Sequence, residues 1–257
     1  MKVRMKKLLF IILMLLAAGQ ALPQSAEYQS MLQQANQFYA DNQYSSAIDL
    51  YEKILTGRYE SAVLYFNLGN AYFKSNDIPS AILNYEKALK MDPTDPDIRF
   101  NLELANSRII DKIEPLPEFF LKSWWKSARN LMSSDRWART GLASLFLMLA
   151  AAFLFITSRN ILLRKISFWA GTVFIVFMLF SFIFSASGYR NYQQASSGII
   201  FTPTVTVKSS PNENSVDLFV IHEGTKVYIT DHIEGWSEIR LVNGNVGWVK
   251  SSVYKPV

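Results

Sequence analysis

The sequence predicts a multidomain membrane protein built from three kinds of structure. An all-α region of helical repeats comes first, two transmembrane helices follow, and an all-β module ends the chain. Three observations support this prediction. A pattern of large and small residues recurs 34 positions apart in the first half of the chain, two long uncharged stretches lie in the middle, and β-rich runs separated by turn residues occupy positions 199–257.

The first 21 residues have the order of a secretion signal. Four basic residues among the first seven precede the apolar run Leu8–Ala18, and the small residues Gly19 and Ala21 follow it. A basic start, a short apolar core and small residues before the cleavage point are typical of a signal peptide. We expect residues 1–21 to direct export. An uncleaved anchor is the alternative, and in either case the segment that follows is translocated.

Residues 24–112 hold the 34-residue pattern. In the second copy, small residues at helical spacing stand where two antiparallel helices would touch, and aromatic rings surround them. The eight positions of the pattern in this copy hold Tyr65, Leu68, Gly69, Tyr72, Ala81, Tyr85, Ala88 and Pro93. The corresponding positions of the first copy hold Met31, Gln34, Ala35, Phe38, Ala47, Tyr51, Ile54 and Tyr59. The pattern resembles the tetratricopeptide (TPR) repeat, which the second copy matches at all eight positions and the first copy at fewer.

The helix boundaries of the second copy can be predicted as well. Asn76 and Asp77 end its first helix, Pro79 opens the next, and the run Asp92–Pro96 ends that one. A further helix over Ile98–Ile110 continues the period. We expect it to cap the stack, because stacked repeats bury a face that one repeat cannot bury alone.

The resemblance to TPR proteins implies a docking surface for protein partners. In that family the inner helices line a concave groove, and the register of the repeat assigns these groove positions: Asn36, Tyr39, Phe66, Asn70, Phe73, Lys74, Phe100 and Arg108. Asn70 and Lys74 lie one helical turn apart, and we expect them to serve binding and not folding. For Phe66 and Phe100, packing between repeats is the alternative role.

Two helices are expected to cross a membrane, over residues 140–158 and 166–188, with a loop over 159–165 between them. Neither stretch contains a charged residue, and about 20 apolar residues span the hydrocarbon core of a bilayer. Buried core helices are the alternative, but the run 174–180 is apolar on every side. The loop is basic, which favours a cytoplasmic position and places both soluble parts outside.

Residues 113–139 are predicted to form an amphipathic linker before the first span. Phe120, Trp124 and Leu131 lie along one side of a helix in this segment, and basic residues lie along another. Such a helix is typical of the lipid headgroup layer, and a short packed linker helix is the alternative. A simple count of basic residues would place the segment in the cytoplasm, but the export signal outweighs that count.

Residues 199–257 are expected to form a small β module. The predicted strands are Thr204–Lys208, Phe219–His222, Lys226–Thr230, Trp236–Leu241 and Val246–Val249, and Asn243-Gly244 is a hairpin turn. With its two Gly-Trp pairs, this pattern resembles the bacterial SH3 domain, a small five- or six-stranded barrel that binds peptides or cell-wall material. Trp236 and Trp248 would then line a ligand groove, the alternative being that both pack into the barrel.

The residues give no support for catalysis. The chain has no cysteine, and its two histidines, His222 and His232, lie ten residues apart without the supporting cluster that a metal site of three or four ligands needs. Gly-rich phosphate loops and nucleophile elbows are absent as well. We therefore expect no catalytic residue, no metal and no cofactor. The net charge of +5 is concentrated beside the apolar stretches, so it indicates membrane topology and not a nucleic-acid partner.

The order of signal, repeats, spans and β module resembles the exported, BatE-like TPR proteins of the Bacteroides aerotolerance (Bat) operon. The resemblance implies a bacterial inner-membrane protein with both soluble parts in the periplasm. It also implies partners that include membrane proteins with von Willebrand A domains and an AAA-type ATPase. The leading hypothesis is a non-enzymatic scaffold whose TPR groove docks a protein partner. The alternative is a cell-envelope anchor whose SH3-like module binds peptidoglycan or wall peptides.

Overall fold

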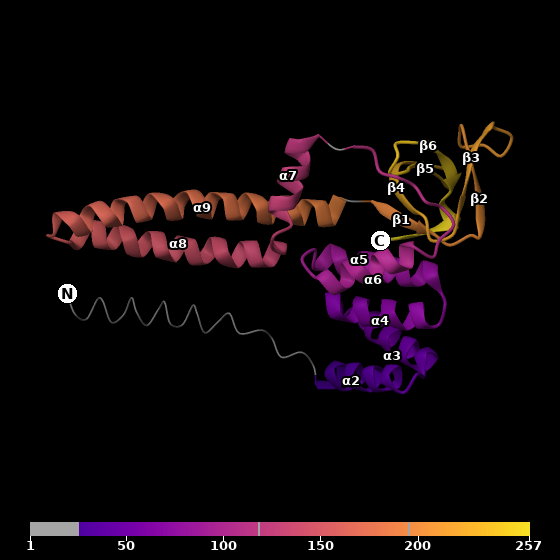
Figure 1. The fold of residues 1–257 in the computed structure, drawn as a ribbon, viewed down its shortest axis with the longest axis horizontal. Helices are drawn as coiled ribbons and strands as arrows, with labels where there is room; N and C mark the ends of the chain where they lie inside the picture. Colours follow the sequence, from indigo (N-terminus) through magenta and orange to yellow (C-terminus); the bar gives the residue numbers. More distant parts are fainter. Residues whose placement is uncertain (1–25, 118, 195) are drawn as a thin grey trace. The chain divides into compact units, whose positions relative to one another are not determined.

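The computed structural model describes residues 26–117, 119–194 and 196–257 (Figure 1). The predicted export signal over residues 1–21 lies outside these residues. The chain divides into two compact units, one that ends at Tyr59 and one that starts at Glu60. Each unit is described by itself.

The first unit contains an antiparallel pair of helices, α2 (Ala26–Ala40) and α3 (Tyr44–Thr56). Their contact surface holds small residues of the repeat pattern beside larger ones, since Ala35, Ala47 and Tyr51 are at most 1% exposed. The hydroxyl group of Tyr51 donates a hydrogen bond of 2.7 Å to Oδ1 of Asn36 and so ties α3 to α2.

The second unit opens with three helices, α4 (Ala62–Lys74), α5 (Ile78–Met91) and α6 (Pro96–Asn106). Each begins at a polar residue whose side chain accepts a hydrogen bond from a backbone N–H of the first turn. These residues are Ser61, Asp77 and Asp95. The predicted helix breaks are confirmed, although the third helix ends at Asn106, four residues before the expected Ile110.

The same turn follows the first helix of both repeats. Asn42 and Asn76, which are 34 positions apart, both adopt a positive φ, at 60° and 64°. The backbone N–H groups of Gln43 and Asp77 each donate to a carbonyl five residues earlier, at 2.8 and 3.0 Å. This is the geometry of a helix end closed by a residue in the left-handed region, which asparagine tolerates well. The predicted 34-residue register is therefore present in the backbone of both units.

Gly69 lies where α4 and α5 approach each other. A Cβ atom added there would lie 2.7 Å from two ring carbons of Tyr85. Ala81 and Ala88 on α5 are also fully buried. The small residues of the pattern therefore allow close helix contact, as the sequence predicts.

A helical hairpin follows the short helix α7 (Phe120–Arg129). It consists of α8 (Ser134–Thr157) and α9 (Ile161–Gln194), which lie side by side in Figure 1. Both helices are long and apolar enough to cross a membrane, by length and composition, and little of their apolar surface is buried inside the protein. The turn between them takes only residues 158–160 and not the expected 159–165. It is short because Oδ1 of Asn160 accepts a hydrogen bond from the N–H of Leu162 and so starts α9 early.

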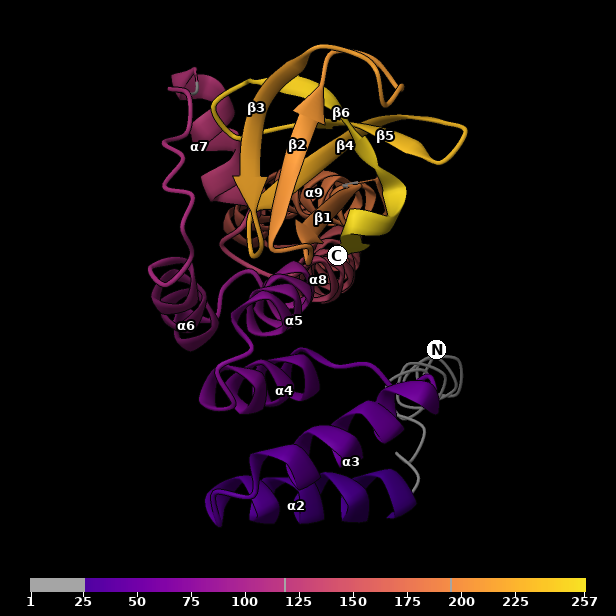
Figure 2. The ribbon, with the colours of Figure 1, turned by 90° about the vertical axis from the view of Figure 1, so that its right-hand side faces the viewer.

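The chain ends in a seven-stranded antiparallel sheet in the order β3-β2-β6-β5-β4-β1-β7 (Figure 2). The strands are β1 (Ser197–Ile200), β2 (Thr204–Lys208), β3 (Asp217–His222), β4 (Lys226–Ile233), β5 (Trp236–Arg240), β6 (Val246–Lys250) and β7 (Tyr254–Pro256). The five predicted strands are confirmed. The two that the sequence did not predict, β1 and β7, are short.

The predicted closed barrel is not present, because β3 and β7 are edges of the sheet and do not pair with each other. The strand β7 has only three residues, and its Pro256 has no N–H to donate to a further strand. The strands β1 to β6 still contribute to one hydrophobic core, which includes Val207, Ile221 and Ile239. The sheet therefore surrounds a core without closing.

The helices α5 and α6 share a second hydrophobic cluster with the sheet. Ile199 of β1 and Ile82 of α5 are fully buried in this cluster, which also holds the buried Leu102 of α6, and Phe201 packs against them. An ion pair of 2.6 Å joins Lys226 of β4 to Glu86 of α5. The repeat helices of the second unit are therefore capped by the sheet as well as by α6.

Asp111 forms a polar joint between the segment after α6 and the sheet. Its Oδ2 accepts hydrogen bonds from the backbone N–H of His222 and from Thr225 Oγ1, both at 2.6 Å, and its Oδ1 lies 2.9 Å from Nδ1 of His222. Burial alone would raise the pKa of Asp111. The hydrogen bonds from Thr225 and His222 outweigh burial, so the pKa of this carboxyl group lies below its ordinary value.

Candidate protein-binding groove

The surface shared by α4 and α6 is the candidate groove in the second unit. Phe66, Asn70 and Phe73 lie at spacings of four and three residues on α4, so they share one side of that helix. The helix α6 contacts α4, and Asn101 of α6 reaches Asn70 directly. The structure thus brings two of the predicted positions together, Phe73 of α4 and Arg108 after α6, and places Asn101 of α6 against Asn70.

Asn70 forms part of the structural floor of this groove. Its Oδ1 accepts hydrogen bonds from the hydroxyl group of Tyr85 at 2.7 Å and from Nδ2 of Asn101 at 2.8 Å. Asn70 therefore connects α4 to both α5 and α6, which is a structural role that the sequence did not predict, and its role in binding stays a prediction. The bond from Tyr85 to Asn70 repeats, 34 positions later, the bond from Tyr51 to Asn36 in the first unit.

The exposed part of the groove is apolar and basic. Phe100 and Leu104 lie one turn apart on α6, with 66% and 40% of their surfaces exposed. The Arg108 guanidinium group lies over the ring of Phe73, 5.2 Å from its centroid, and Lys74 at the end of α4 is exposed. A protein segment could place an apolar side chain on Phe100 and Leu104 and a carboxylate beside the two basic groups.

Packing between repeats was the alternative role for Phe66 and Phe100, and the structure distinguishes the two residues. Phe66 is half-buried, and its ring centroid lies 6.0 Å from that of Tyr85. It therefore packs between helices of the repeat. Phe100 is mostly exposed, so packing does not account for it. Leu104 and Asn101 were not among the predicted positions, although the 34-residue period places Leu104 at the equivalent of Asn70 and could have identified it.

Asn36 and Tyr39 belong to α2 in the first unit and are described there by themselves. Asn36 accepts the hydrogen bond from Tyr51 described above. The ring of Tyr39 is half-buried and lies 5.5 Å from that of Tyr44. Burial, and to a lesser degree Tyr44, raises the pKa of the Tyr39 phenol, so this side chain remains neutral at physiological pH.

Trp236 and Trp248 lie on the outer face of the sheet. Side chains alternate between the two faces of a strand, and the core residues Ile239 and Val249 occupy the other face of β5 and β6. Both tryptophans are half-buried, and Trp248 is directly opposite Glu238 in the register. Neither indole belongs to the hydrophobic core of the sheet.

The polar clusters of the described residues do not form a reactive site. Ser237 contacts His232, Ser251 and Tyr254 at 2.7–3.0 Å, but Ser237 is fully buried and cannot reach a substrate. Within residues 26–117, 119–194 and 196–257 there is no group of three or more His, Cys, Asp or Glu side chains that could hold a metal ion. Nothing in this part of the chain shows catalytic activity.

Comparison with known proteins identifies a TPR repeat. The TPR repeat model matches residues 69–108, which include the end of α4 and the whole of both α5 and α6. Among solved structures, the crystal structure of the Sgt2 TPR domain from Aspergillus fumigatus is 16% identical over 66% of this chain and 83% of that chain, with a TM-score of 0.31. A likeness at that TM-score supports no argument about function. No curated protein matches the chain significantly in sequence.

Proposed function

We propose that this protein is a non-enzymatic membrane scaffold that docks a protein partner on the groove between α4 and α6. TPR repeats are protein-interaction modules, and one is present over residues 69–108. The observation that carries the proposal is the exposed pair Phe100 and Leu104 on α6, the helix that contacts α4, where Arg108 lies over the ring of Phe73. The partner segment would supply an apolar anchor and a carboxylate.

The groove is suited to docking because its floor is held in place before a partner arrives. The hydrogen bonds from Tyr85 and Asn101 to Asn70 fix three helices relative to one another. A preformed surface loses little conformational entropy on binding. The exposed aromatic side chain of Phe100 then provides contact area, as is common at the centre of protein interfaces.

The proposal includes a position in the bacterial inner membrane. The helices α8 and α9 would cross the bilayer, with the basic turn at residues 158–160 in the cytoplasm and the TPR region and the sheet in the periplasm. This placement agrees with kinship to the exported TPR proteins of the Bat operon. Under that kinship, the partners would be membrane proteins with von Willebrand A domains and an AAA-type ATPase complex.

Site-specific photocrosslinking in membranes of the native cell tests this function. A photoreactive phenylalanine analogue at Phe100 should give a discrete adduct with one partner protein. The same analogue at Val216, which is 70% exposed just before β3, is the matched control and should give no such adduct. The additional change Arg108→Glu should remove the adduct. Equal adducts at Phe100 and Val216, or no adduct at Phe100, would contradict the proposal.

A second candidate function is a cell-envelope anchor. The observation that favours it is the position of Trp236 and Trp248 on the outer face of the sheet, where their indoles are not part of the core. Under this proposal the sheet acts as an SH3-like module that binds peptidoglycan or wall peptides. The full chain should then sediment with purified cell wall, and Trp248→Ala should reduce sedimentation without changing photocrosslinking at Phe100.

A further inference from the structure

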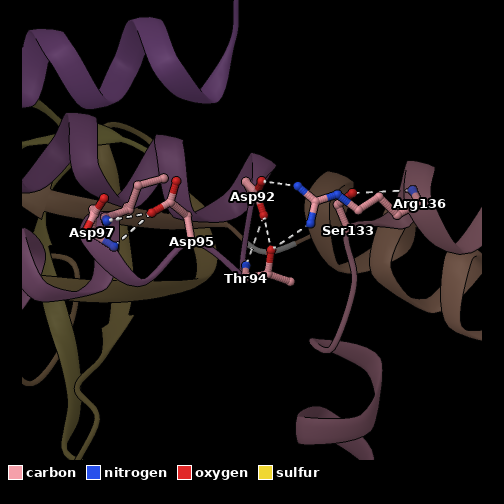
Figure 3. Close-up of polar contacts among 7 residues, drawn as sticks. Asp92, Thr94, Asp95, Asp97, Ser133 and Arg136 are labelled. Carbon is pink, nitrogen blue, oxygen red and sulfur yellow. Dashed lines mark hydrogen bonds and ion pairs between the residues drawn. The ribbon is translucent and has the colours of Figure 1, made fainter.

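A cavity of about 1280 Å³ lies where α5, α7, the sheet and one end of the helical hairpin meet in the second unit. One wall is the loop between α5 and α6, which Arg136 ties to the start of α8 (Figure 3). The guanidinium group of Arg136 lies 3.1 Å from Oδ2 of Asp92 and donates to Oγ1 of Thr94 at 3.3 Å. These polar contacts join the loop between α5 and α6 to α8, two segments that line the cavity.

The lining of the cavity is rich in positive charge. Two acidic side chains line it, and one of them, Glu86, is already paired with Lys226. Six basic side chains line it, namely Lys90, Lys122, Lys126, Arg129, Lys226 and Arg240. These basic groups come from α5, α7, β4 and β5, so the fold gathers them from four separate elements. Burial, and then the nearby charge of Lys226, lowers the pKa of Lys90, as expected where basic groups are crowded.

One side of the cavity is aromatic. The ring centroids of Trp125 and Trp137 each lie 5.0 Å from that of Phe184. The indole N–H of Trp137 donates to the backbone carbonyl of Arg129 at 2.8 Å and so fixes the start of α8 against the end of α7. An anion with an apolar body would match both the basic groups and this aromatic wall.

The position of the cavity on the hairpin suggests the source of such an anion. The lining includes Ser134 at the start of α8 and Gly188 near the end of α9, and the turn at residues 158–160 is at the other end of the hairpin. Phe120 and Trp124 of α7 lie one turn apart and are 68% and 67% exposed. A helix that combines exposed aromatic residues with lysines is typical of the headgroup layer.

We infer that this cavity binds the phosphate group of an anionic phospholipid. The basic side chains of α7 and of Arg240 would contact the phosphate, and the rings of Trp125, Trp137 and Phe184 would contact the glycerol and upper acyl carbons. The bound lipid would join the helical hairpin to the sheet and to α5. The inference rests on the membrane placement proposed above, and it is independent of partner docking at Phe100.

Lipid titration of the full chain tests the inference. The chain is reconstituted in nanodiscs of phosphatidylcholine, and short-chain phosphatidylglycerol or phosphatidylcholine is added while binding is followed by native mass spectrometry. We expect phosphatidylglycerol to bind at least tenfold more tightly than phosphatidylcholine. Lys122→Gln with Arg240→Gln should abolish this preference. A preference that persists in this double variant would overturn the inference, as would equal binding of the two lipids.

A variant of equal charge provides the control. Arg139→Gln with Lys165→Gln removes two basic groups that do not line the cavity and should leave the lipid preference intact. Loss of the preference for phosphatidylglycerol in this control would show a general effect of charge and would contradict the assignment of the lipid site to this cavity. Soluble glycerol phosphate is the last competitor tested. If it displaces the lipid at equal concentration, the site is assigned to free phosphate and not to a phospholipid. Failure of the chain to enter phosphatidylcholine nanodiscs would contradict the proposed membrane placement itself.

Discussion

Replacing Asn70 with alanine should destabilise the second unit through the loss of two hydrogen bonds. Asn70 Oδ1 accepts from Tyr85 at 2.7 Å and from Asn101 at 2.8 Å. Each hydrogen bond contributes about 0.5–1.5 kcal/mol net, so Asn70→Ala should cost about 1–3 kcal/mol. For a unit of this size, 1 kcal/mol corresponds to roughly 2–4 °C in Tm. The expected decrease in Tm is therefore roughly 2–12 °C.

Thermal unfolding of the full chain in mild detergent, followed by far-ultraviolet circular dichroism, measures this effect. Lys74→Ala is the control on the same helix. Lys74 is exposed, so its loss should change stability by no more than about 0.5 kcal/mol. Tyr85→Phe removes only the hydroxyl donor, and the double variant Asn70→Ala with Tyr85→Phe should cost less than the sum of the two single changes. Equal melting of the Asn70→Ala and Lys74→Ala chains would refute the structural role assigned to Asn70.

Three further predictions concern packing, pH and topology. Gly69→Leu should lower stability by about 1–3 kcal/mol, because its side chain would overlap the ring of Tyr85, and an unchanged Tm would mean that the helix contact is misassigned. The hydrogen bonds of the Asp111 carboxylate should stabilise the fold fully at a pH above the ordinary carboxyl pKa. This stabilisation should be lost as the pH falls through the lowered pKa of Asp111. The protection factors of amides in the sheet, measured by hydrogen exchange, should therefore fall in acid, and Asp111→Asn should remove that dependence; an equally steep dependence in the variant would assign it to another group. Alkaline phosphatase fused after Ala105 should be active and fused near Asn160 inactive, and the opposite result would reverse the proposed topology.

The sequence predicted the repeat helices well because their determinants are local. The spacing of small and aromatic residues, the capping aspartates and the proline-rich break all act within a few turns of each helix. The backbone turn at Asn42 and Asn76 recurs at the predicted 34-residue period. The five central strands were predicted for a similar reason, since alternation and the Asn243-Gly244 turn are local signals.

The sequence did not predict contacts between distant segments. Asn70 was predicted to be a binding residue from its position in the repeat register, whereas its hydrogen-bond partners Tyr85 and Asn101 lie 15 and 31 positions away. The strand β1 was missed because it is short and is defined by pairing with β4 and β7. The basic cavity could not be predicted either, because its charges come from four elements separated along the chain.

The most direct test of the central proposal is the affinity of the crosslinked partner for the full chain in nanodiscs. Phe100→Ser with Leu104→Ser removes the exposed apolar pair, and groove anchors of this kind often contribute more than about 1 kcal/mol each. The dissociation constant should therefore rise by roughly tenfold or more, while Tm remains within a few degrees of the unmodified chain. Val216→Ser, just before β3, is the control and should leave the affinity unchanged. Unchanged affinity in a stably folded Phe100→Ser, Leu104→Ser chain would contradict docking at the groove between α4 and α6.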